Sequence, residues 1–267
     1  LITFDSGERY DWVTLIGVLE YSPTFASGPD PVLAYLSQAV RYLKPGGRLV
    51  VAIENKLGLK YFNGCAEDHV GRPFFGVNGL YDGKSVVTFG RAELEQHLRD
   101  AGCRSVEFYY PFPDYKLPTA VISDRAFSES GFHVADMLLR TDSRDYAGRR
   151  NRLFSEQLAA RSLDDNGVLQ HFANSFLVVA SLASEVVTCS PEHLAWTYAL
   201  GRKPQFRTET IFCKDSAGAL GVIKTQIDFS SPGRDEHDLI HHTGTTPYQT
   251  GRLLAWEALK AKHHPDP

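Results

Sequence analysis

The sequence predicts an α/β fold in which parallel strands form part of an open sheet. Two buried strands, expected at residues 13–19 and 48–53, are joined by a helix and by a Pro-Gly-Gly turn at residues 45–47. The first strand is apolar at almost every position, which is typical of a strand covered by helices on both faces. Each strand ends in a short polar segment. Because open parallel sheets bind ligands at the carboxyl ends of their strands, these two segments are candidates for a functional site.

The helix between the two strands has clear boundary signals. Asp30 is a good N-cap residue, and Pro31 fits the first helical position. Apolar residues then recur at helical spacing, at Val32, Leu33, Leu36, Val40 and Leu43. Gly46 and Gly47 are expected to end this helix.

The remaining elements alternate between helices, strands and long loops. Residues 56–88 are rich in glycine and aromatic residues and have little periodicity, and loops of this length are usually functional or disordered. We expect a helix at 91–101, a strand at 105–110, a Pro-rich loop at 111–118, a polar helical region at 125–171 and a strand at 176–180.

Composition and charge exclude several functional classes. The chain has 267 residues, of which 43% are hydrophobic and 22% charged, and its net charge of -4 gives no basic field for nucleic acid or an anionic membrane. No apolar run reaches the roughly 18 residues of a membrane span. There is no signal peptide, so we expect a cytoplasmic location. The chain begins at Leu1, a few residues before a core strand, and we expect it to be a piece of a longer protein.

The cysteines and histidines predict no metal site. Cys65, Cys103, Cys189 and Cys213 are scattered without a C-x-x-C pair, so reduced thiols are expected. The pairs His241-His242 and His263-His264 lack carboxylate or cysteine partners at the spacing of metal ligands.

Residues 10–181 resemble the carboxyl half of a class I S-adenosylmethionine-dependent methyltransferase. The resemblance is carried by the strand-end segment 17–21, the turn Lys44-Pro45-Gly46-Gly47 and the order of the elements that follow. It implies a Rossmann-like sheet with parallel strands and an antiparallel last strand. It also implies S-adenosylmethionine as cofactor, lined by Gly17, Val18, Leu19, Glu20 and Tyr21.

Three longer sequence segments, at residues 54–62, 67–74 and 110–118, indicate a particular subgroup of this family. They are similar to a bacterial subgroup linked to cell-surface polysaccharide biosynthesis and often fused to glycosyltransferase or kinase-like modules. The resemblance implies methyl transfer to a sugar or glycan-linked acceptor, with a fused or associated glycosyltransferase as a possible partner.

One part of the family pattern is missing from the chain. The Gly-rich loop after the first strand of the family, and the acidic residue that binds the ribose, are expected to precede residue 1. We therefore expect this chain alone to bind the cofactor weakly. The alternative interpretation is a non-catalytic scaffold or docking segment of a polysaccharide-assembly protein.

Glu54, Asn55 and Lys56 are candidate substrate-binding residues at the end of the second strand. Neighbouring strands lie about 5 Å apart, so these residues are expected to share one cleft with Glu20 and Tyr21. The structural alternative is that Glu20 caps the next segment and Tyr21 packs in the core.

His69 is the candidate general base, because an imidazole with an ordinary pKa near 6.5 can deprotonate a sugar hydroxyl. Asp68 would orient the ring, and Arg72 would hold an anionic group of the acceptor. The alternative is a loop histidine beside a solvated aspartate. Asp114 and Tyr115, followed by Lys116, lie in the Pro-stiffened loop, where preorganisation favours acceptor binding over an ordinary turn.

The sequence divides into three parts. Residues 1–185 are predicted to form the partial methyltransferase domain, 186–204 a linker and 205–267 a small α+β appendage, with a hairpin at 209–226 and a helix at 252–262. Lys224 faintly resembles the strand lysine of kinases, but no kinase motif accompanies it, so a solvated strand lysine is the preferred interpretation.

Overall fold

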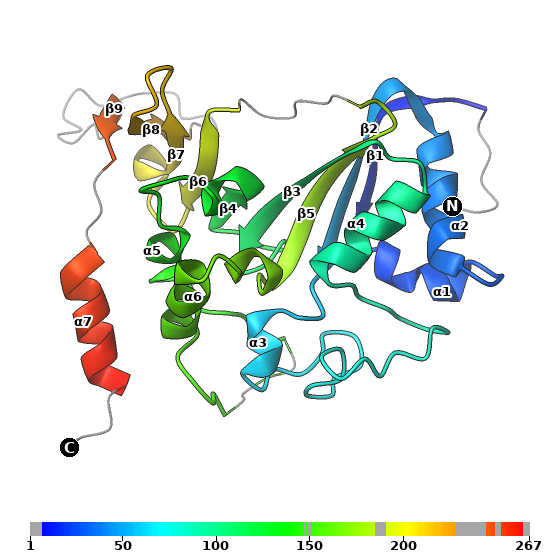
Figure 1. Cartoon of the computed structure of the whole chain (residues 1–267), viewed down its shortest axis with the longest axis horizontal. Coiled ribbons are helices and arrows are strands. Elements are labelled where there is room, and N and C mark those ends of the chain that lie inside the picture. The colour runs from blue at the N-terminus through cyan, green and yellow to red at the C-terminus, as the bar shows by residue number, and fades with distance from the viewer. Residues whose placement is uncertain are drawn as a thin grey trace.

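The computed structural model describes residues 7–146, 148, 151–184, 191–227, 244–248 and 252–263. The strands are β1 (Tyr10–Ile16), β2 (Leu43–Glu54), β3 (Ser105–Phe112), β4 (Ala120–Ser123), β5 (Ser175–Ser181), β6 (His193–Ala199), β7 (Thr208–Lys214), β8 (Leu220–Gln226) and β9 (Gly244–Pro247). They form one nine-stranded sheet in the order β1-β2-β5-β3-β4-β6-β7-β8-β9 (Figure 1). The fold is therefore mixed α/β.

The helices include seven α-helical segments and four short 3-10 turns in the described part of the chain. They are α1 (Ser22–Phe25), α2 (Pro31–Arg41), α3 (Leu59–Phe62), α4 (Arg91–Asp100), α5 (Val134–Leu138), α6 (Glu156–Asp165) and α7 (Arg252–His263), with η1 (Leu19–Tyr21), η2 (Asp124–Phe127), η3 (Leu169–His171) and η4 (Pro204–Phe206).

Strand direction brings three loops to one edge of the sheet. β1 pairs with β2 in parallel, and β5 lies between β2 and β3 and runs antiparallel to both. β1, β2 and β3 therefore point the same way, and the predicted antiparallel last strand is β5. The segments that follow Ile16, Glu54 and Phe112 all leave from this carboxyl edge.

Helices α2 and α4 lie side by side over the sheet (Figure 1). The side chain of Asp30 accepts a hydrogen bond from the Leu33 amide at 2.9 Å, which confirms the predicted N-cap of α2. Gly90 is the N-cap of helix α4, and its amide donates to Glu93 Oε2 at 2.8 Å. Leu36 on α2 and Leu94 on α4 have no exposed surface and lie in the core beneath the two helices.

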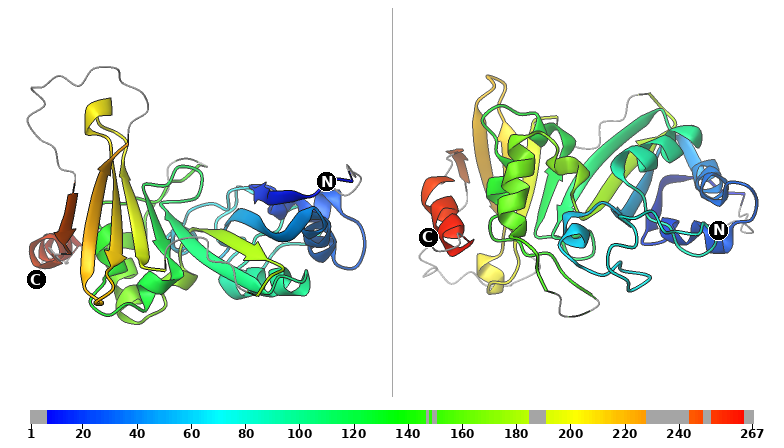
Figure 2. Two further views of the ribbon diagram at one scale, coloured as in Figure 1. Left: turned by 90° about the horizontal axis from the view of Figure 1, so that it is seen from above. Right: turned by 60° about the horizontal axis from the view of Figure 1, so that its bottom comes forward.

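The second half of the chain continues the same sheet. The predicted hairpin is present as β7 and β8, and β6 joins β4 to it through antiparallel pairing. Sheet twist accumulates along these strands, so β6, β7 and β8 run at a large angle to β1 and β2 (Figure 2). In α7 the Trp256 indole is 1% exposed and donates to Asp136 Oδ1 at 2.7 Å. This contact fastens the terminal helix to α5.

Three expectations about these elements are wrong. Strand β1 is not covered on both faces, because Trp12 and Ile16 are 50% and 56% exposed. Among the described residues it pairs with β2 alone, so it lies at the edge of the sheet. Helix α2 ends at Arg41 rather than at Gly46, because β2 begins at Leu43 and runs through the glycine pair. The segment predicted as a linker contains β6, whose Leu194 and Ala195 are buried. The division into domains stays a prediction.

The long segment 56–88 is ordered by contacts with its surroundings. Its backbone returns to η1 through a hydrogen bond from the Val87 amide to the Glu20 carbonyl at 2.9 Å. Cys65 and Glu67, in its middle, are 0% and 2% exposed. The segment therefore places fixed side chains, His69 among them, beside the carboxyl edge. His241, His242 and His264 lie outside the described residues, and His263 is exposed at the end of α7.

Candidate functional site

A glycine turns the chain at the end of β1. Gly17 has φ +62°, and its amide donates to the Ala52 carbonyl of β2 at 2.9 Å. A Cβ at this position would lie 2.9 Å from the Tyr115 hydroxyl oxygen. Only glycine fits both the left-handed backbone and the close approach of Tyr115. The turn leads directly into η1 and so places Glu20 beside the end of β2.

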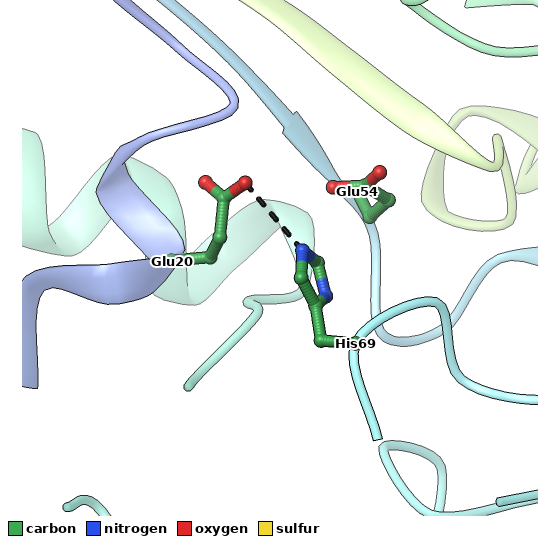
Figure 3. Close-up of side chains that lie close together, drawn as sticks. All are labelled: Glu20, Glu54 and His69. Atoms are coloured by element: carbon green, nitrogen blue, oxygen red, sulfur yellow. Dashed lines mark ion pairs between the residues drawn. The ribbon is translucent and has the colours of Figure 1, made fainter. Parts of the chain in front are cut away.

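Glu20, Glu54 and His69 come together at this edge from three separate segments (Figure 3). One ligand-type atom of each residue lies within 4.8 Å of the others. Glu20 and Glu54 are each 1% exposed, and the His69 side chain is 10% exposed. Nε2 of His69 lies 3.5 Å from Oε1 of Glu20. Tyr21 packs edge-on against the imidazole, with ring centroids 5.5 Å apart.

Glu67 fixes the other side of the imidazole. Its Oε1 lies 3.1 Å from His69 Nδ1, and its Oε2 accepts hydrogen bonds from the amides of His69 at 2.8 Å and Val70 at 2.6 Å. Tyr81 donates a further hydrogen bond to Glu67 Oε1 at 3.1 Å. Asp68, the predicted partner of His69, points elsewhere. The carboxylate that orients the ring is therefore one residue earlier than expected.

These neighbours shift two pKa values in opposite directions. Burial disfavours the imidazolium, but hydrogen bonds to Glu20 and Glu67 outweigh it and raise the pKa of His69 to about 10. Burial also disfavours the Glu67 carboxylate, but hydrogen bonds from His69 and Val70 hold its pKa below the ordinary value. In the ligand-free protein His69 is therefore protonated at neutral pH.

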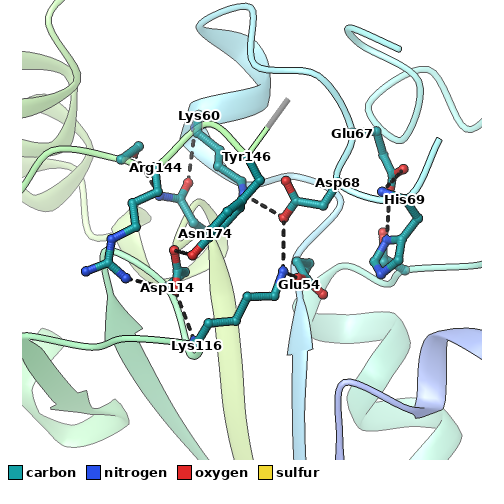
Figure 4. Close-up of polar contacts among 12 residues, drawn as sticks. Glu54, Lys60, Glu67, Asp68, His69, Asp114, Lys116, Arg144, Tyr146 and Asn174 are labelled. Atoms are coloured by element: carbon teal, nitrogen blue, oxygen red, sulfur yellow. Dashed lines mark hydrogen bonds and ion pairs between the residues drawn. The ribbon is translucent and has the colours of Figure 1, made fainter. Parts of the chain in front are cut away.

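Two lysines enclose the acidic side chains from the opposite direction (Figure 4). Lys60 Nζ lies 2.8 Å from Asp68 Oδ2, and both side chains are buried, at 1% and 4% exposure. Lys116 Nζ lies 2.5 Å from Glu54 Oε1 and 3.8 Å from Asp68 Oδ2. Burial raises the pKa of Glu54, and the contact with Lys116 offsets part of that effect.

We call these seven residues the polar cluster: Glu20, Glu54, Glu67 and Asp68 with Lys60, His69 and Lys116. Four carboxylates face three cationic groups within it. When every group is charged, one negative charge is left over, and loss of the His69 proton would leave two. The arrangement therefore favours an additional cation.

The Pro-rich loop reaches the cluster through Tyr115 and Lys116. Asp114 is 2% exposed and closes the turn, because its Oδ1 accepts from the Lys116 amide at 3.0 Å and its Oδ2 accepts from the Tyr146 hydroxyl at 2.8 Å. Burial and the charges of Glu54 and Glu20 raise the pKa of Tyr115. Asp114 thus holds the loop, whereas Tyr115 faces the acidic side chains.

Three other predicted binding residues have partners of their own. Asn55 is fully buried, and its side-chain amide donates to the carbonyls of His171 at 2.8 Å and Ala173 at 2.7 Å. Lys56 forms an ion pair with Glu93 at 2.6 Å. The exposed guanidinium of Arg72 lies over the Phe75 ring, 5.5 Å from its centroid. The structure does not bring these side chains into the polar cluster.

Sequence reasoning missed Glu67 and Lys60. Both lie in the irregular segment 56–88, where no periodicity indicates which side chains point inward. The only available signal was the run of acidic residues beside His69, and it does not distinguish Glu67 from Asp68.

The solved structures similar to the chain include two that contain methyltransferases. No family model and no curated protein sequence matches the chain. A SAM-dependent methyltransferase of Thermotoga maritima, described as a possible histamine N-methyltransferase, is 15% identical with a TM-score of 0.32, covering 66% of this chain and 57% of that one. A Haloferax volcanii complex between the Trm112 methyltransferase activator and a putative methyltransferase matches at 17% identity and TM-score 0.33, covering 67% and 57%.

The chain thus spans little more than half the length of each of these two structures. Identities of 15% and 17% with TM-scores of 0.32 and 0.33 show no function for this chain. No helix in the described part of the chain is long and apolar enough to cross a membrane.

Proposed function

We propose that the chain is part of an enzyme that transfers a methyl group from S-adenosylmethionine to an oxygen of a sugar-containing acceptor. One observation carries the proposal: Glu20 and Glu54, at the carboxyl ends of two adjacent parallel strands, meet His69 in a buried cluster with surplus negative charge. Ligands of open α/β sheets bind at this edge. The strings that resemble class I methyltransferases supply these same residues.

The cofactor would lie against residues 17–21. S-adenosylmethionine carries its methyl group on a positively charged sulfur, and the Glu20 carboxylate, with one oxygen lacking a hydrogen-bond partner, is suited to a cation. Gly17 turns the chain at the strand end beside the Tyr115 hydroxyl, and Leu19 is buried in the core and would support this segment from below. The backbone near Gly17 and Val18 would contact the cofactor, and the aromatic face of Tyr21 would add a cation–π contribution.

The acceptor would lie on the side of Glu54 and Tyr115, with Asp114 holding the loop that carries Tyr115. Asn55 would position the end of β2 through its backbone contacts, and Lys56 and Arg72 would contact outer parts of an extended acceptor. When bound, S-adenosylmethionine would supply the methyl group, and its carbon–sulfur bond would break with the electron pair going to sulfur. The acceptor hydroxyl oxygen would form the new bond to the methyl carbon, and its proton would pass to a base of this chain.

His69 is the proposed base. A cation bound beside Glu20 and Glu54 offsets their charge, lowers the pKa of the ring from about 10 and frees Nε2 to accept a proton. Glu67 would keep the ring oriented, and Asp68 would act through its pairs with Lys60 and Lys116. Glu54 is the second candidate base, because its raised pKa makes it a stronger proton acceptor than an ordinary carboxylate.

The acceptor class rests on the resemblance of residues 54–62, 67–74 and 110–118 to enzymes of bacterial cell-surface polysaccharide biosynthesis. We extend the proposal to a glycan-linked acceptor, a fused or associated glycosyltransferase and a cytoplasmic site of action. A docking segment without catalysis is the competing role.

The test uses S-adenosylmethionine with an isotopically labelled methyl group and the cell-surface glycan fraction as acceptor. We expect label on the glycan with the wild-type protein and a loss of about a hundredfold or more with His69→Ala. Glu95→Gln, on the surface of α4, is the matched control and should behave as wild type. Cofactor binding without transfer to any sugar would contradict the acceptor class, and no cofactor binding would favour the docking role.

A further inference from the structure

The trio Glu20, Glu54 and His69 has the composition of a metal site. An imidazole nitrogen and two carboxylates are ligands shared by Zn²⁺, Mn²⁺ and Fe²⁺. The three residues come from η1, the end of β2 and the segment 56–88, so the fold itself brings them together (Figure 3).

The distances are close to those that such an ion requires. Bonds of about 2.1 Å at tetrahedral angles place neighbouring ligand atoms about 3.4 Å apart. Nε2 of His69 and Oε1 of Glu20 are 3.5 Å apart, and the ligand atoms of all three residues lie within 4.8 Å of one another.

A buried oxygen without a partner points to a missing cation. Glu20 is 1% exposed, and among the described residues its Oε2 accepts no hydrogen bond. A buried carboxylate oxygen without a hydrogen-bond partner destabilises the fold unless a ligand or an ion contacts it. Glu54 Oε2 likewise accepts no hydrogen bond in the described structure, while Lys116 occupies Oε1.

The His69 ring is oriented by a carboxylate at Nδ1, as is usual for a histidine that binds a metal ion. A ligating histidine donates its second ring N–H to a carboxylate or carbonyl, which fixes the tautomer and aims the free nitrogen at the ion. Glu67 Oε1 lies 3.1 Å from Nδ1, so Nε2 is the nitrogen that faces Glu20.

We propose that Glu20, Glu54 and His69 bind one divalent first-row transition metal ion, through Nε2 of His69 and one or two oxygens of each carboxylate. The assignment goes beyond the proposed function, because it concerns metal binding by this chain in the absence of cofactor. An ion at Nε2 replaces the proton that this nitrogen otherwise carries, so in the metal-loaded form His69 is a ligand and not the base. An acceptor hydroxyl bound to the ion would lose its proton more readily.

Calorimetry and Mn²⁺ electron paramagnetic resonance on the whole chain test the site with Mn²⁺ and Zn²⁺ alone. We expect one ion per chain, and a loss of affinity of about tenfold or more in Glu20→Gln and in His69→Gln. Glu95→Gln and His97→Gln change the same residue types on α4 and should retain wild-type affinity. Circular dichroism confirms that each variant is folded.

A second measurement needs no variant. Mn²⁺ broadens the NMR signals of nearby nuclei, and we expect the strongest broadening at Glu20, Glu54 and His69 of the wild-type protein. The assignment would be overturned if neither Mn²⁺ nor Zn²⁺ binds, or if Glu20→Gln and His69→Gln bind the ion with wild-type affinity. Line broadening centred on other residues would also overturn it. These outcomes do not depend on S-adenosylmethionine, so they are distinguishable from failure of the proposed function.

Discussion

Nδ1 of His69 lies 3.1 Å from Oε1 of Glu67, while Nε2 of the same ring faces Glu20 at 3.5 Å. The imidazole therefore bridges two carboxylates, one at each nitrogen. Glu67 is itself held by the amides of His69 and Val70, so it cannot rotate away without losing both bonds. The ring orientation follows from local backbone geometry.

Removing the charge of Glu67 should lower the pKa of His69. In the metal-free protein we expect Glu67→Gln to move this pKa from about 10 toward the ordinary value of 6.5, because one of the carboxylates that stabilise the imidazolium becomes neutral. NMR titration of the ring protons measures the shift. Glu95→Gln is the matched control, and an unchanged His69 pKa in Glu67→Gln would contradict the arrangement.

The same pKa predicts how stability depends on pH. The folded-state pKa of His69, about 10, is above the unfolded value of 6.5, so unfolding releases a proton between these values. The stabilisation from His69 is fully present below pH 6.5 and is lost as pH rises toward 10.

The measurement is the free energy of unfolding of wild type relative to His69→Gln, with a chelator present. The difference in free energy of unfolding between the two proteins should decrease as pH rises from 6.5 to 10, by at most about 1.4 kcal/mol per pH unit. A difference that stays constant from pH 6.5 to 10 would show that His69 is neutral in the folded protein.

Asn55→Ala should destabilise the fold rather than weaken acceptor binding specifically. The mutation removes the donors to the His171 and Ala173 carbonyls and the acceptor for the Leu57 amide. Leaving buried groups unpaired costs about 1–3 kcal/mol each, so we expect a loss of at least 2 kcal/mol in urea unfolding. Gln96→Ala, an exposed amide on α4, is the control, with an expected change within about 0.5 kcal/mol.

Gly17→Ala separates backbone strain from side-chain collision. Gly46 also has a positive φ, +77°, but no atom lies within 4 Å of a Cβ built there, whereas a Cβ at Gly17 meets the Tyr115 hydroxyl. Each alanine should cost about 1–2 kcal/mol for its left-handed conformation.

Gly17→Ala should lower the free energy of unfolding by more than Gly46→Ala does. Adding Tyr115→Phe to Gly17→Ala should reduce this difference, because it removes the hydroxyl that the new Cβ meets. Urea unfolding of the two single variants and the double variant measures it. Equal costs for the two alanines would mean that Tyr115 does not approach Gly17 in solution.

The sequence predicts regular elements better than the site. The Asp30 cap, the β7–β8 hairpin and the terminal helix carry local signals in their own residues, and the structure confirms them. The exposure of β1 depends on which strands flank it, which no local pattern encodes. The pairing of His69 with Glu67 depends on the turn at residues 67–70, where side-chain direction follows from backbone hydrogen bonds rather than from periodicity.

Polar residues at the strand ends are the part of the site that sequence reasoning can find. Glu20 and Glu54 follow from parallel strand topology alone. The sequence places Lys116 in a loop but does not indicate which carboxylate it pairs with, and Lys60 lies in an irregular segment. Lys60 pairs with Asp68, 8 residues away in the sequence, and Lys116 pairs with Glu54, 62 residues away. Such pairings arise from tertiary packing.

NMR titration of the wild-type chain with S-adenosylmethionine tests whether the polar cluster binds the cofactor, and it detects weak as well as tight binding. We expect the amide signals of Gly17, Glu20 and Tyr21 to shift together with the ring signals of His69. The same titration of Glu20→Gln should give smaller shifts, while Glu95→Gln should give the wild-type response. Shifts confined to other parts of the chain, or none at millimolar cofactor, would contradict the assignment of this cluster as the cofactor site.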